Sequence, residues 1–310
     1  MSAVRTVFLG SGPFGVPSLR MLAAHADVDL VGVVTAPPRP AGREHALAAT
    51  PIDQAAAELG IRTILRPSRL RDPAALASIL ALRPALTVLA DYGQIVPPAL
   101  LDLPHGALNL HPSLLPRYRG ASPIAATILA GDRETGVTLM RMDEGLDTGP
   151  IVAAERSPLD GTETAPDLEA RLADLAAGLL QRSIGPWLAA ALPAVPQPAD
   201  GATLTRPLRR EDGRLAPGDT AAELERRVRA FQPWPGTFLE LPTGRLAVHA
   251  AHVEHGAADD VRGTLIAHGD GLALVTADEW LVLDEVQPAG GRRMSASALR
   301  RGRPGLVAGR

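Results

Sequence analysis

The sequence predicts a two-domain protein in which a doubly wound α/β domain with a parallel sheet precedes a small β-barrel. The chain has 310 residues, which is long for a single average domain. Its first half alternates helical stretches with continuous apolar runs of strand length, the pattern of strands buried on both faces of a parallel sheet. Beyond about residue 205 the pattern changes to short strands separated by glycine-rich turns.

The elements of the first domain follow from this alternation. Strand–helix alternation of this kind indicates a Rossmann-like, doubly wound fold, which we expect over residues 1–191. A long helix rich in alanine and leucine, over about 166–191, is expected to pack across the sheet. The expected strands cover 4–10, 30–35, 61–65, 85–90 and 107–111, and the helices between them cover 14–25, 52–59 and 72–82.

The second domain is expected to follow a linker. Residues 192–205 contain three prolines and no apolar period, so they are interpreted as this linker. Residues 206–310 begin with a predicted helix over 221–231 and continue as short strands, which indicates a small β-barrel of the OB-like class. The expected strands cover 237–241, 246–252, 263–268, 271–276 and 280–287.

Composition excludes several classes of protein. The absence of cysteine excludes a disulfide framework, a thiol nucleophile and any cysteine-ligated metal site. No apolar run approaches the roughly 18 residues of a membrane span, and the first residues lack the apolar core of a signal peptide. A cytoplasmic protein without membrane attachment is therefore expected. The net charge of −3 gives no general attraction to nucleic acid, so a polyanion would need a local patch.

A glycine-rich motif lies between the first predicted strand and helix. Residues 10–15, GSGPFG, match the dinucleotide-binding pattern G-x-G-x-x-G. A dinucleotide site would also need an acidic residue at the end of the second strand, whereas residues 33–36 read VVTA. Pro13 removes one backbone N–H from the loop. A tight strand-to-helix turn is therefore the preferred interpretation, and a nicotinamide-dependent oxidoreductase is the alternative that this motif alone supports.

The densest cluster of polar residues is the segment 108–120, LNLHPSLLPRYRG. Asn109 and His111 are two positions apart on a predicted strand, so their side chains leave the same face near its carboxyl end, where open α/β sheets bind ligands. The acidic loop 142–149 could bring a carboxylate onto the imidazole. An amide, an imidazole and a carboxylate suit acyl transfer, because they can stabilise an oxyanion and move a proton. A structural role for the strand-end Asn and His is the alternative, and spacing alone does not decide between the two.

These segments resemble a known family. NLHPSLLPRYRGASPI, residues 109–124, and MDEGLDTGPI, residues 142–151, resemble two active-site motifs of the folate-dependent formyltransferases. The likeness extends over nearly the whole chain. It includes residues 8–22, 38–43, 89–97, 229–236 and 286–291.

The resemblance implies a reaction and its site residues. Asn109, His111 and Asp147 would be the catalytic residues, with 10-formyltetrahydrofolate as the formyl donor. The acceptor would be the α-amine of the methionine carried by initiator tRNA. No metal and no covalent enzyme intermediate would be needed, and analogy favours a monomer. The implied folate contacts are Ser113, Leu114, Leu115, Pro116, Tyr92, Gly93 and Ile95.

The resemblance also implies contacts with tRNA, and here the sequence departs from the family pattern. The inserted loop after the second strand is usually rich in lysine and arginine, but here it offers only Arg39 and Arg43. All 31 basic residues of the chain are arginines. In the second domain, Arg206 and Arg210 are the candidate contacts. Because electrostatic affinity scales with the number of phosphates neutralised, we expect a weak salt dependence of tRNA binding.

Other functions stay open at this stage. A sugar-nucleotide N-formyltransferase would use the same donor and the same Asn–His–Asp set with a different amine. A related hydrolase would release the formyl group to water. A non-catalytic RNA-binding module would need aromatic side chains on which bases stack, and the nine aromatic residues of the chain are few for this purpose.

Overall fold

The computed structural model describes residues 3–41, 46–256 and 261–306. Its contacts divide the chain into two compact units. Unit 1 comprises Met1–Pro123, Glu134–Pro158 and Leu168–Thr205, and unit 2 comprises Ile124–Arg133, Leu159–Asp167 and Arg206–Arg310. The domain boundaries expected from the sequence, at residues 191 and 205, stay predictions.

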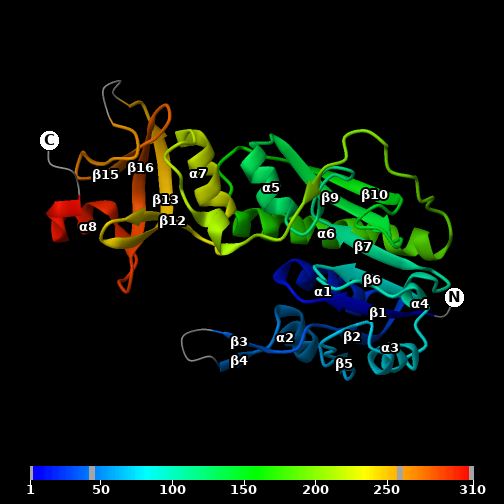
Figure 1. Ribbon diagram of the computed structural model, residues 1–310. Helices are drawn as coiled ribbons and strands as arrows, with labels where there is room; N and C mark the ends of the chain where they lie inside the picture. The colour runs from blue at the N-terminus through cyan, green and yellow to red at the C-terminus, as the bar shows by residue number, and fades with distance from the viewer. Residues whose placement is uncertain (1–2, 42–45, 257–260, 307–310) are drawn as a thin grey trace. The chain divides into compact units, whose positions relative to one another are not determined.

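Unit 1 is built on a seven-stranded sheet with the strand order β10-β9-β7-β6-β1-β2-β5 (Figure 1). The parallel strands are β1 (Val4–Gly10), β2 (Val28–Val34), β5 (Ile64–Leu65), β6 (Leu86–Ala90) and β7 (Ala107–His111). The expected Rossmann-like α/β fold is confirmed. Two antiparallel strands at one edge, β9 (Glu134–Arg141) and β10 (Ile151–Pro158), were not predicted, because charged residues interrupt the apolar pattern of β10.

The helices of unit 1 begin where the sequence provides N-terminal signals. The Thr50 side chain accepts a hydrogen bond from the Asp53 N–H at 3.0 Å, and Pro51 takes the first helical position of α2. Prolines also open α3 and α4. The elements of this unit are η1 (Pro13–Gly15), α1 (Val16–Ala24), α2 (Pro51–Glu58), α3 (Pro73–Leu80), α4 (Pro98–Leu101) and α6 (Ala165–Leu188), whose first residues belong to unit 2.

The glycine-rich turn between β1 and η1 packs directly against the end of β6. A Cβ atom added to Gly10 would lie 2.7 Å from the carbonyl oxygen of Ala90, and one added to Gly15 would lie 3.0 Å from the same atom. An added Cβ at Gly12 would meet the Asp91 side chain, which follows β6. Close approach of the turn to the backbone of β6 therefore accounts for Gly10 and Gly15.

The strand order places a topological switch point between β1 and β6. The chain builds β2 and β5 on one side of β1 and then returns to build β6 and β7 on the other. Ligands of open α/β sheets bind at the carboxyl ends of the strands near such a point. In the register of the sheet, Asn109 of β7 lies beside Leu89 of β6 and Met140 of β9, and His111 lies beside Thr138.

The segment that the sequence analysis interprets as a linker is attached to unit 1. Val195 and Ile151 exchange two backbone hydrogen bonds of 2.7 and 2.8 Å. Further along, β11 (Leu204–Thr205) pairs in parallel with β8 (Arg119–Gly120). A separate antiparallel pair, β3 (Arg39–Ala41) and β4 (Ala46–Ala48), follows β2.

Unit 2 is an antiparallel β domain with the strand path β12-β13-β16-β15-β14, and β17 pairs with β16. The antiparallel β domain expected for the second part of the chain is confirmed, and between its described strands no ladder joins β12 to β14. The strands are β12 (Thr237–Leu241), β13 (Gly244–Glu254), β14 (Leu265–His268), β15 (Gly271–Val275), β16 (Trp280–Pro288) and β17 (Met294–Ser295).

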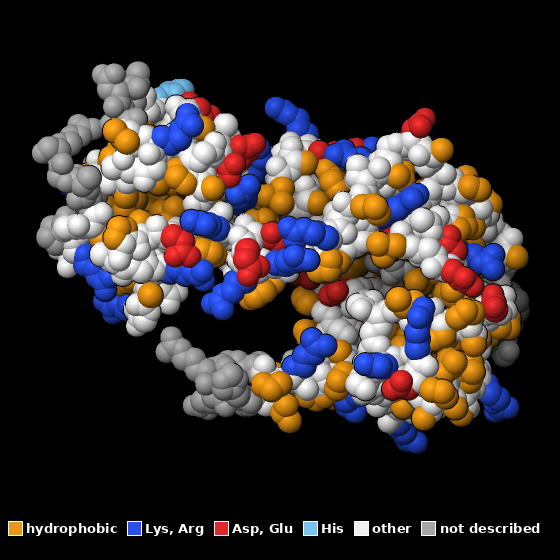
Figure 2. Space-filling model, in the orientation of Figure 1, with side chains coloured by type: hydrophobic (Ala, Val, Ile, Leu, Met, Phe, Trp, Pro, Cys, Tyr) orange, Lys and Arg blue, Asp and Glu red, His pale blue; other side chains and the backbone are white. Residues whose placement is uncertain are grey.

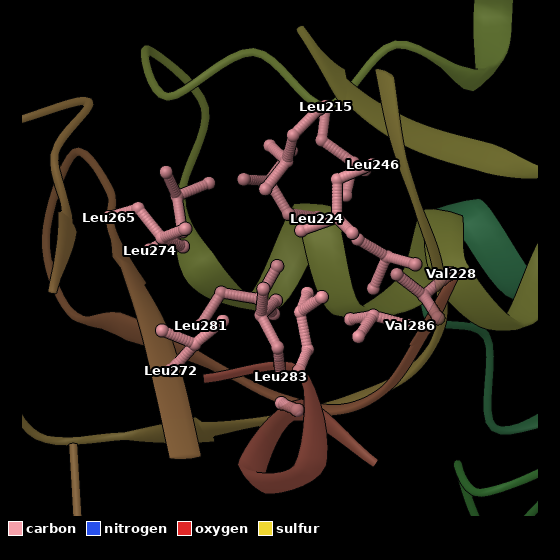
Figure 3. Close-up of a cluster of buried hydrophobic side chains, with 14 residues drawn as sticks. Leu215, Leu224, Val228, Leu246, Leu265, Leu272, Leu274, Leu281, Leu283 and Val286 are labelled. Carbon is pink, nitrogen blue, oxygen red and sulfur yellow. The ribbon is translucent and has the colours of Figure 1, made fainter. Parts of the chain in front are cut away.

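A leucine-rich core holds unit 2 together. Most of its leucines and valines come from the strands and from α7 (Ala221–Ala230), with Leu215 from the segment before that helix, and they point toward one another (Figure 3). A reciprocal capping box between Thr220 and Glu223 begins α7. The core also receives Leu299 from α8 (Ala296–Gly302), a helix that was not predicted. Two shorter elements, η2 (Arg210–Gly213) and η3 (Pro304–Leu306), complete this part of the chain.

Unit 2 also contains two short segments from earlier in the chain. Arg226 of α7 donates to the carbonyl oxygen of Leu129, which lies in α5 (Pro123–Ala130), at 3.0 Å. Arg229 donates to the carbonyl oxygen of Glu163 at 2.9 Å. Two arginines of one helix therefore hold both segments in this unit. Across the described ranges of the chain, no helix combines the length and apolarity needed to cross a membrane.

Candidate active site

His111 lies at the carboxyl end of β7 and is almost entirely buried, with 4% of its surface exposed. Its Nε2–H donates to the carbonyl oxygen of Tyr118 at 2.8 Å, and its Nδ1 lies 3.6 Å from Oδ2 of Asp147. Burial lowers the pKa of His111, while the negative charge of Asp147 and the Tyr118 carbonyl oppose this shift. The imidazole is therefore held with Nε2 protonated and Nδ1 facing a carboxylate.

Asp147 is held in place at its side chain and at its backbone. Oδ2 accepts a hydrogen bond of 2.7 Å from the N–H of Gly120, and the side chain is only 13% exposed. The backbone of Asp147 has φ of +51°, a left-handed conformation that aspartate adopts more readily than most residues. The acidic loop thus folds back onto the imidazole, as expected from the sequence.

Asn109 lies on the same face of β7 as His111 and is half-buried. Among the described residues, no hydrogen-bonding partner engages its side-chain amide. The three predicted catalytic residues therefore occupy two neighbouring features of unit 1, the end of β7 and the loop between β9 and β10. Their roles as catalytic residues stay predictions.

The predicted folate contacts in the loop 113–116 are mostly engaged within the protein. Ser113 is fully buried, and its hydroxyl donates to the carbonyl oxygen of Arg117 at 2.6 Å. Thr138 of β9 accepts a hydrogen bond from the N–H of Leu115 at 3.1 Å and donates to the carbonyl oxygen of Ser113 at 2.7 Å. Leu115 is also buried, whereas Leu114 and Pro116 are half-buried.

The predicted folate contacts after β6 differ in exposure. Tyr92 packs against the apolar core of unit 1, and burial raises its pKa to about 12. Its hydroxyl has no hydrogen-bonding partner in the described structure. Ile95 is 63% exposed, and Gly93 is exposed as well. Ile95 is therefore the apolar side chain of this group that a ligand can reach.

A cavity of about 310 Å³ lies in unit 1 beside the acidic loop. None of the predicted folate contacts lines this cavity. Leu146, next to Asp147, is 60% exposed and adds an apolar surface to the same loop. The cavity is lined by Pro98, Leu101, Asp102, Arg141, Met142, Asp143, Glu144 and Pro150.

The predicted tRNA contacts fall into three groups. Arg39 on β3 and Arg210 on η2 are exposed, and no described residue pairs with their guanidinium groups. Arg206 binds the Asp212 carboxylate through two hydrogen bonds of 2.8 and 2.6 Å, and this pairing lowers the pKa of Asp212 to about 2. Arg43 lies outside the described residues. On the face shown in Figure 2, arginines lie interspersed with acidic side chains.

Several residues that shape the site carry no recognisable signal in the sequence or only a weak one. Gln197, in the segment interpreted as a linker, donates to the carbonyl oxygens of Asp147 and Gly149, each at 2.8 Å. Tyr118 orients His111 through its carbonyl oxygen, and Thr138 fixes the loop after it. Backbone groups leave no trace in a sequence, but a lone glutamine within a proline-rich segment could have been singled out. Within the described part of the chain, no group of three or more His, Asp or Glu residues could hold a metal ion.

Two family models match this chain. The formyl transferase model covers residues 4–184, and the model of the formyl transferase C-terminal domain covers residues 207–304. The chain is also similar to the methionyl-tRNA formyltransferase of Roseiflexus sp. (strain RS-1). The two are 44% identical over 301 residues, which are 96% of this chain and 92% of that protein.

Solved structures agree in fold. An N-formyltransferase from Helicobacter canadensis, in complex with folinic acid and dTDP-3-aminofucose, has a TM-score of 0.66 at 15% identity and covers 94% of this chain and 100% of that one. HypX from Aquifex aeolicus in complex with tetrahydrofolic acid has a TM-score of 0.64 at 14% identity, covering 96% of this chain and 47% of that one. The two family models and the near-full-length relative show that the chain belongs to the formyl transferase family.

Proposed function

We propose that this enzyme transfers a formyl group from 10-formyltetrahydrofolate to the α-amine of methionyl initiator tRNA, for translation initiation. The observation that carries this proposal is the near-full-length similarity to a methionyl-tRNA formyltransferase, combined with an Asn–His–Asp set at the carboxyl ends of the strands. We infer that the protein acts in the cytoplasm, because initiator tRNA is charged there. By analogy with the family, we also infer that it is a monomer.

The reaction begins when the neutral amine attacks the formyl carbon, which forms a C–N bond and an oxyanion. The Asn109 amide is free of partners among the described residues and would donate a hydrogen bond to this oxyanion. Since the Nε2 proton of His111 is engaged by the Tyr118 carbonyl, we assign the proton of the attacking amine to Nδ1. Asp147 would stabilise the imidazolium that results.

Collapse of the tetrahedral species then breaks the bond between the formyl carbon and N10 of the folate. The imidazolium would return its proton to N10 as the leaving nitrogen departs, which restores neutral His111. The lowered pKa of His111 suits this cycle, because the residue starts as a neutral base.

The folate would lie against the acidic loop and the turn after β6. Ile95 and Leu146 offer exposed apolar contacts for a flat ring. The cavity lined by part of the acidic loop has the volume of a small ligand site, and its Asp102, Asp143 and Glu144 carboxylates could accept hydrogen bonds from the amino and ring N–H groups of a pterin. We propose Gly93, Ile95, Leu114 and Pro116 as the contacts among the predicted set that a bound folate could reach.

The proposed function is tested by supplying 10-formyltetrahydrofolate with either methionyl initiator tRNA or a dTDP-amino sugar and following the formylated product by mass spectrometry. We expect formyl-methionine on the tRNA and no product from the sugar. Formylation of the sugar alone would contradict the proposed acceptor. Release of formate without an acceptor would indicate a hydrolase instead. Uncharged initiator tRNA is the control.

A further inference from the structure

Residues 195–205, here called the strap, bind unit 1 at three places around the candidate active site. At one end Val195 exchanges backbone hydrogen bonds with Ile151, the first residue of β10. At the other end Thr203 accepts a backbone hydrogen bond from Arg119, and its hydroxyl accepts one from the N–H of Tyr118. Between these two ends the strap contributes one side chain to the acidic loop, Gln197.

Both the nitrogen and the oxygen of the Gln197 carboxamide form hydrogen bonds. Its nitrogen donates to the carbonyl oxygens of Asp147 and Gly149, each at 2.8 Å. Its oxygen accepts from Nε and an amino group of Arg119 at 3.1 and 2.7 Å. A flipped amide would point N–H groups at a guanidinium and an oxygen at two carbonyls, so the network fixes the orientation of the amide.

These contacts reach Asp147 by two routes. The first is direct, because Gln197 holds the carbonyl oxygen of a residue whose backbone is in the left-handed region. The second runs through Arg119, which precedes Gly120, and the N–H of Gly120 binds the Asp147 carboxylate. One carboxamide therefore supports both the backbone and the side chain of Asp147.

We propose that Gln197 is a positioning residue for formyl transfer: it locks the loop that carries Asp147 and so holds that carboxylate against His111. The step that it supports rests on the proposed function. Within the described structure Gln197 forms no hydrogen bond with His111 or Asn109, so we assign its effect to its hydrogen bonds with Asp147, Gly149 and Arg119. The strap thus has a role in the site in addition to connecting two parts of the chain.

The test is Gln197→Glu in the full-length enzyme. The carboxylate keeps an acceptor for Arg119 but has no N–H for the two carbonyls, and it repels them. We expect kcat to fall about 10- to 100-fold, since a misplacement of about 1 Å can cost that much, with the KM for 10-formyltetrahydrofolate changed less than about two-fold. Gln181→Glu, on the exposed face of α6, makes the same chemical change away from the site and should leave kcat unchanged.

A second readout does not depend on the identity of the acceptor. The ring signals of His111, assigned by comparison with His111→Gln, are titrated by NMR in the wild type, in Gln197→Ala and in the matched Gln181→Ala. Asp147 raises the pKa of His111, so a displaced Asp147 should lower that pKa in Gln197→Ala, which adds no charge near the ring, and leave it unchanged in Gln181→Ala. Gln197→Ala also replaces Gln197→Glu in the kinetic test if that variant does not fold.

The outcomes separate the two proposals. A fall in kcat together with a lower His111 pKa supports the positioning role. An unchanged His111 titration overturns it, whatever happens to kcat. If the wild type does not formylate tRNA but the pKa of His111 still falls in Gln197→Ala, the proposed acceptor is wrong and the positioning role stands.

Discussion

At the scale of single residues, Asn109 and His111 show that one strand can present one side chain held by a hydrogen bond and another without a described partner. His111 is buried and bound through Nε2, whereas Asn109 is half-buried and its amide has no described partner. Because Asn109 is half-buried and its amide has no described partner, that amide is available to a bound ligand, as the proposed oxyanion role requires.

Asn109→Ala should lower turnover at least ~100-fold, the cost expected for losing one oxyanion donor. Because no described hydrogen bond depends on the Asn109 side chain, the melting temperature should stay close to that of the wild type. Single-turnover formylation assays and thermal unfolding of the same preparation measure the two quantities. Near-normal turnover would remove Asn109 from the mechanism.

His111 should also make the stability of the protein depend on pH. Its pKa is lowered in the folded state below the ordinary value of 6.5, so the unfolded chain takes up a proton first as the pH falls. The stabilisation is complete above pH 6.5 and is lost as the pH falls from there toward the folded pKa, by at most about 1.4 kcal/mol per pH unit.

The measurement is the free energy of unfolding of the wild type and of His111→Gln between pH 7.5 and pH 5. Glutamine does not titrate, so the difference between the two proteins isolates the histidine. We expect the wild type to lose stability relative to the variant as the pH falls. A difference that stays constant over this range contradicts a lowered pKa.

At the scale of elements, the turn between β1 and η1 shows that a motif can match a ligand-binding pattern for a packing reason. Gly10 and Gly15 both lie against the carbonyl oxygen of Ala90, so the turn and the end of β6 fit together only without side chains. The sequence favours a tight turn here because it lacks the acidic residue that a dinucleotide site needs at the end of the second strand. The structure supplies the physical reason for the glycines.

Gly10→Ala should destabilise unit 1 by about 1–3 kcal/mol, because the new Cβ would lie 2.7 Å from a backbone oxygen and the strands must separate to accommodate it. Gly93→Ala is the matched control for stability, since an added Cβ at Gly93 has no atom within 4 Å. Chemical denaturation of the two variants measures the difference. Equal stability of the two variants would contradict the packing role of Gly10.

At the scale of the whole molecule, the arginines differ in whether they are free to bind a phosphate. Arg206 forms a paired contact with Asp212, whereas Arg210, four residues later, has no described partner. Pairing with a carboxylate cancels the charge that a phosphate would meet. The number of basic residues in the sequence therefore overstates the electrostatic attraction that the protein offers to tRNA.

Arg210→Ala should weaken tRNA binding and reduce the slope of log Kd against log salt concentration by about 1. Arg206→Ala should change the slope less, because its charge is already compensated by Asp212. Binding titrations at several salt concentrations compare the two variants. A larger effect at Arg206 than at Arg210 would contradict this assignment.

The sequence by itself determined the order of the five parallel strands and the helices between them, and it singled out Asn109 and His111 as candidate catalytic residues. Continuous apolar runs predicted the five parallel strands, because a strand buried on both faces needs no polar side chain. The positions of Asn109 and His111 on one face followed from the period of a strand. Asp147 was placed by resemblance to the family, since spacing alone gives only a nearby acidic loop.

The tertiary structure decided what connects these residues. The antiparallel strands β9 and β10, the attachment of the strap and the pairing of Arg206 all depend on contacts between segments far apart in the chain. The Tyr118 carbonyl and the Gly120 N–H are backbone groups, which every residue possesses, so no sequence pattern marks them. Gln197 lies 50 residues from Asp147, and only folding brings its amide within hydrogen-bonding distance of that loop.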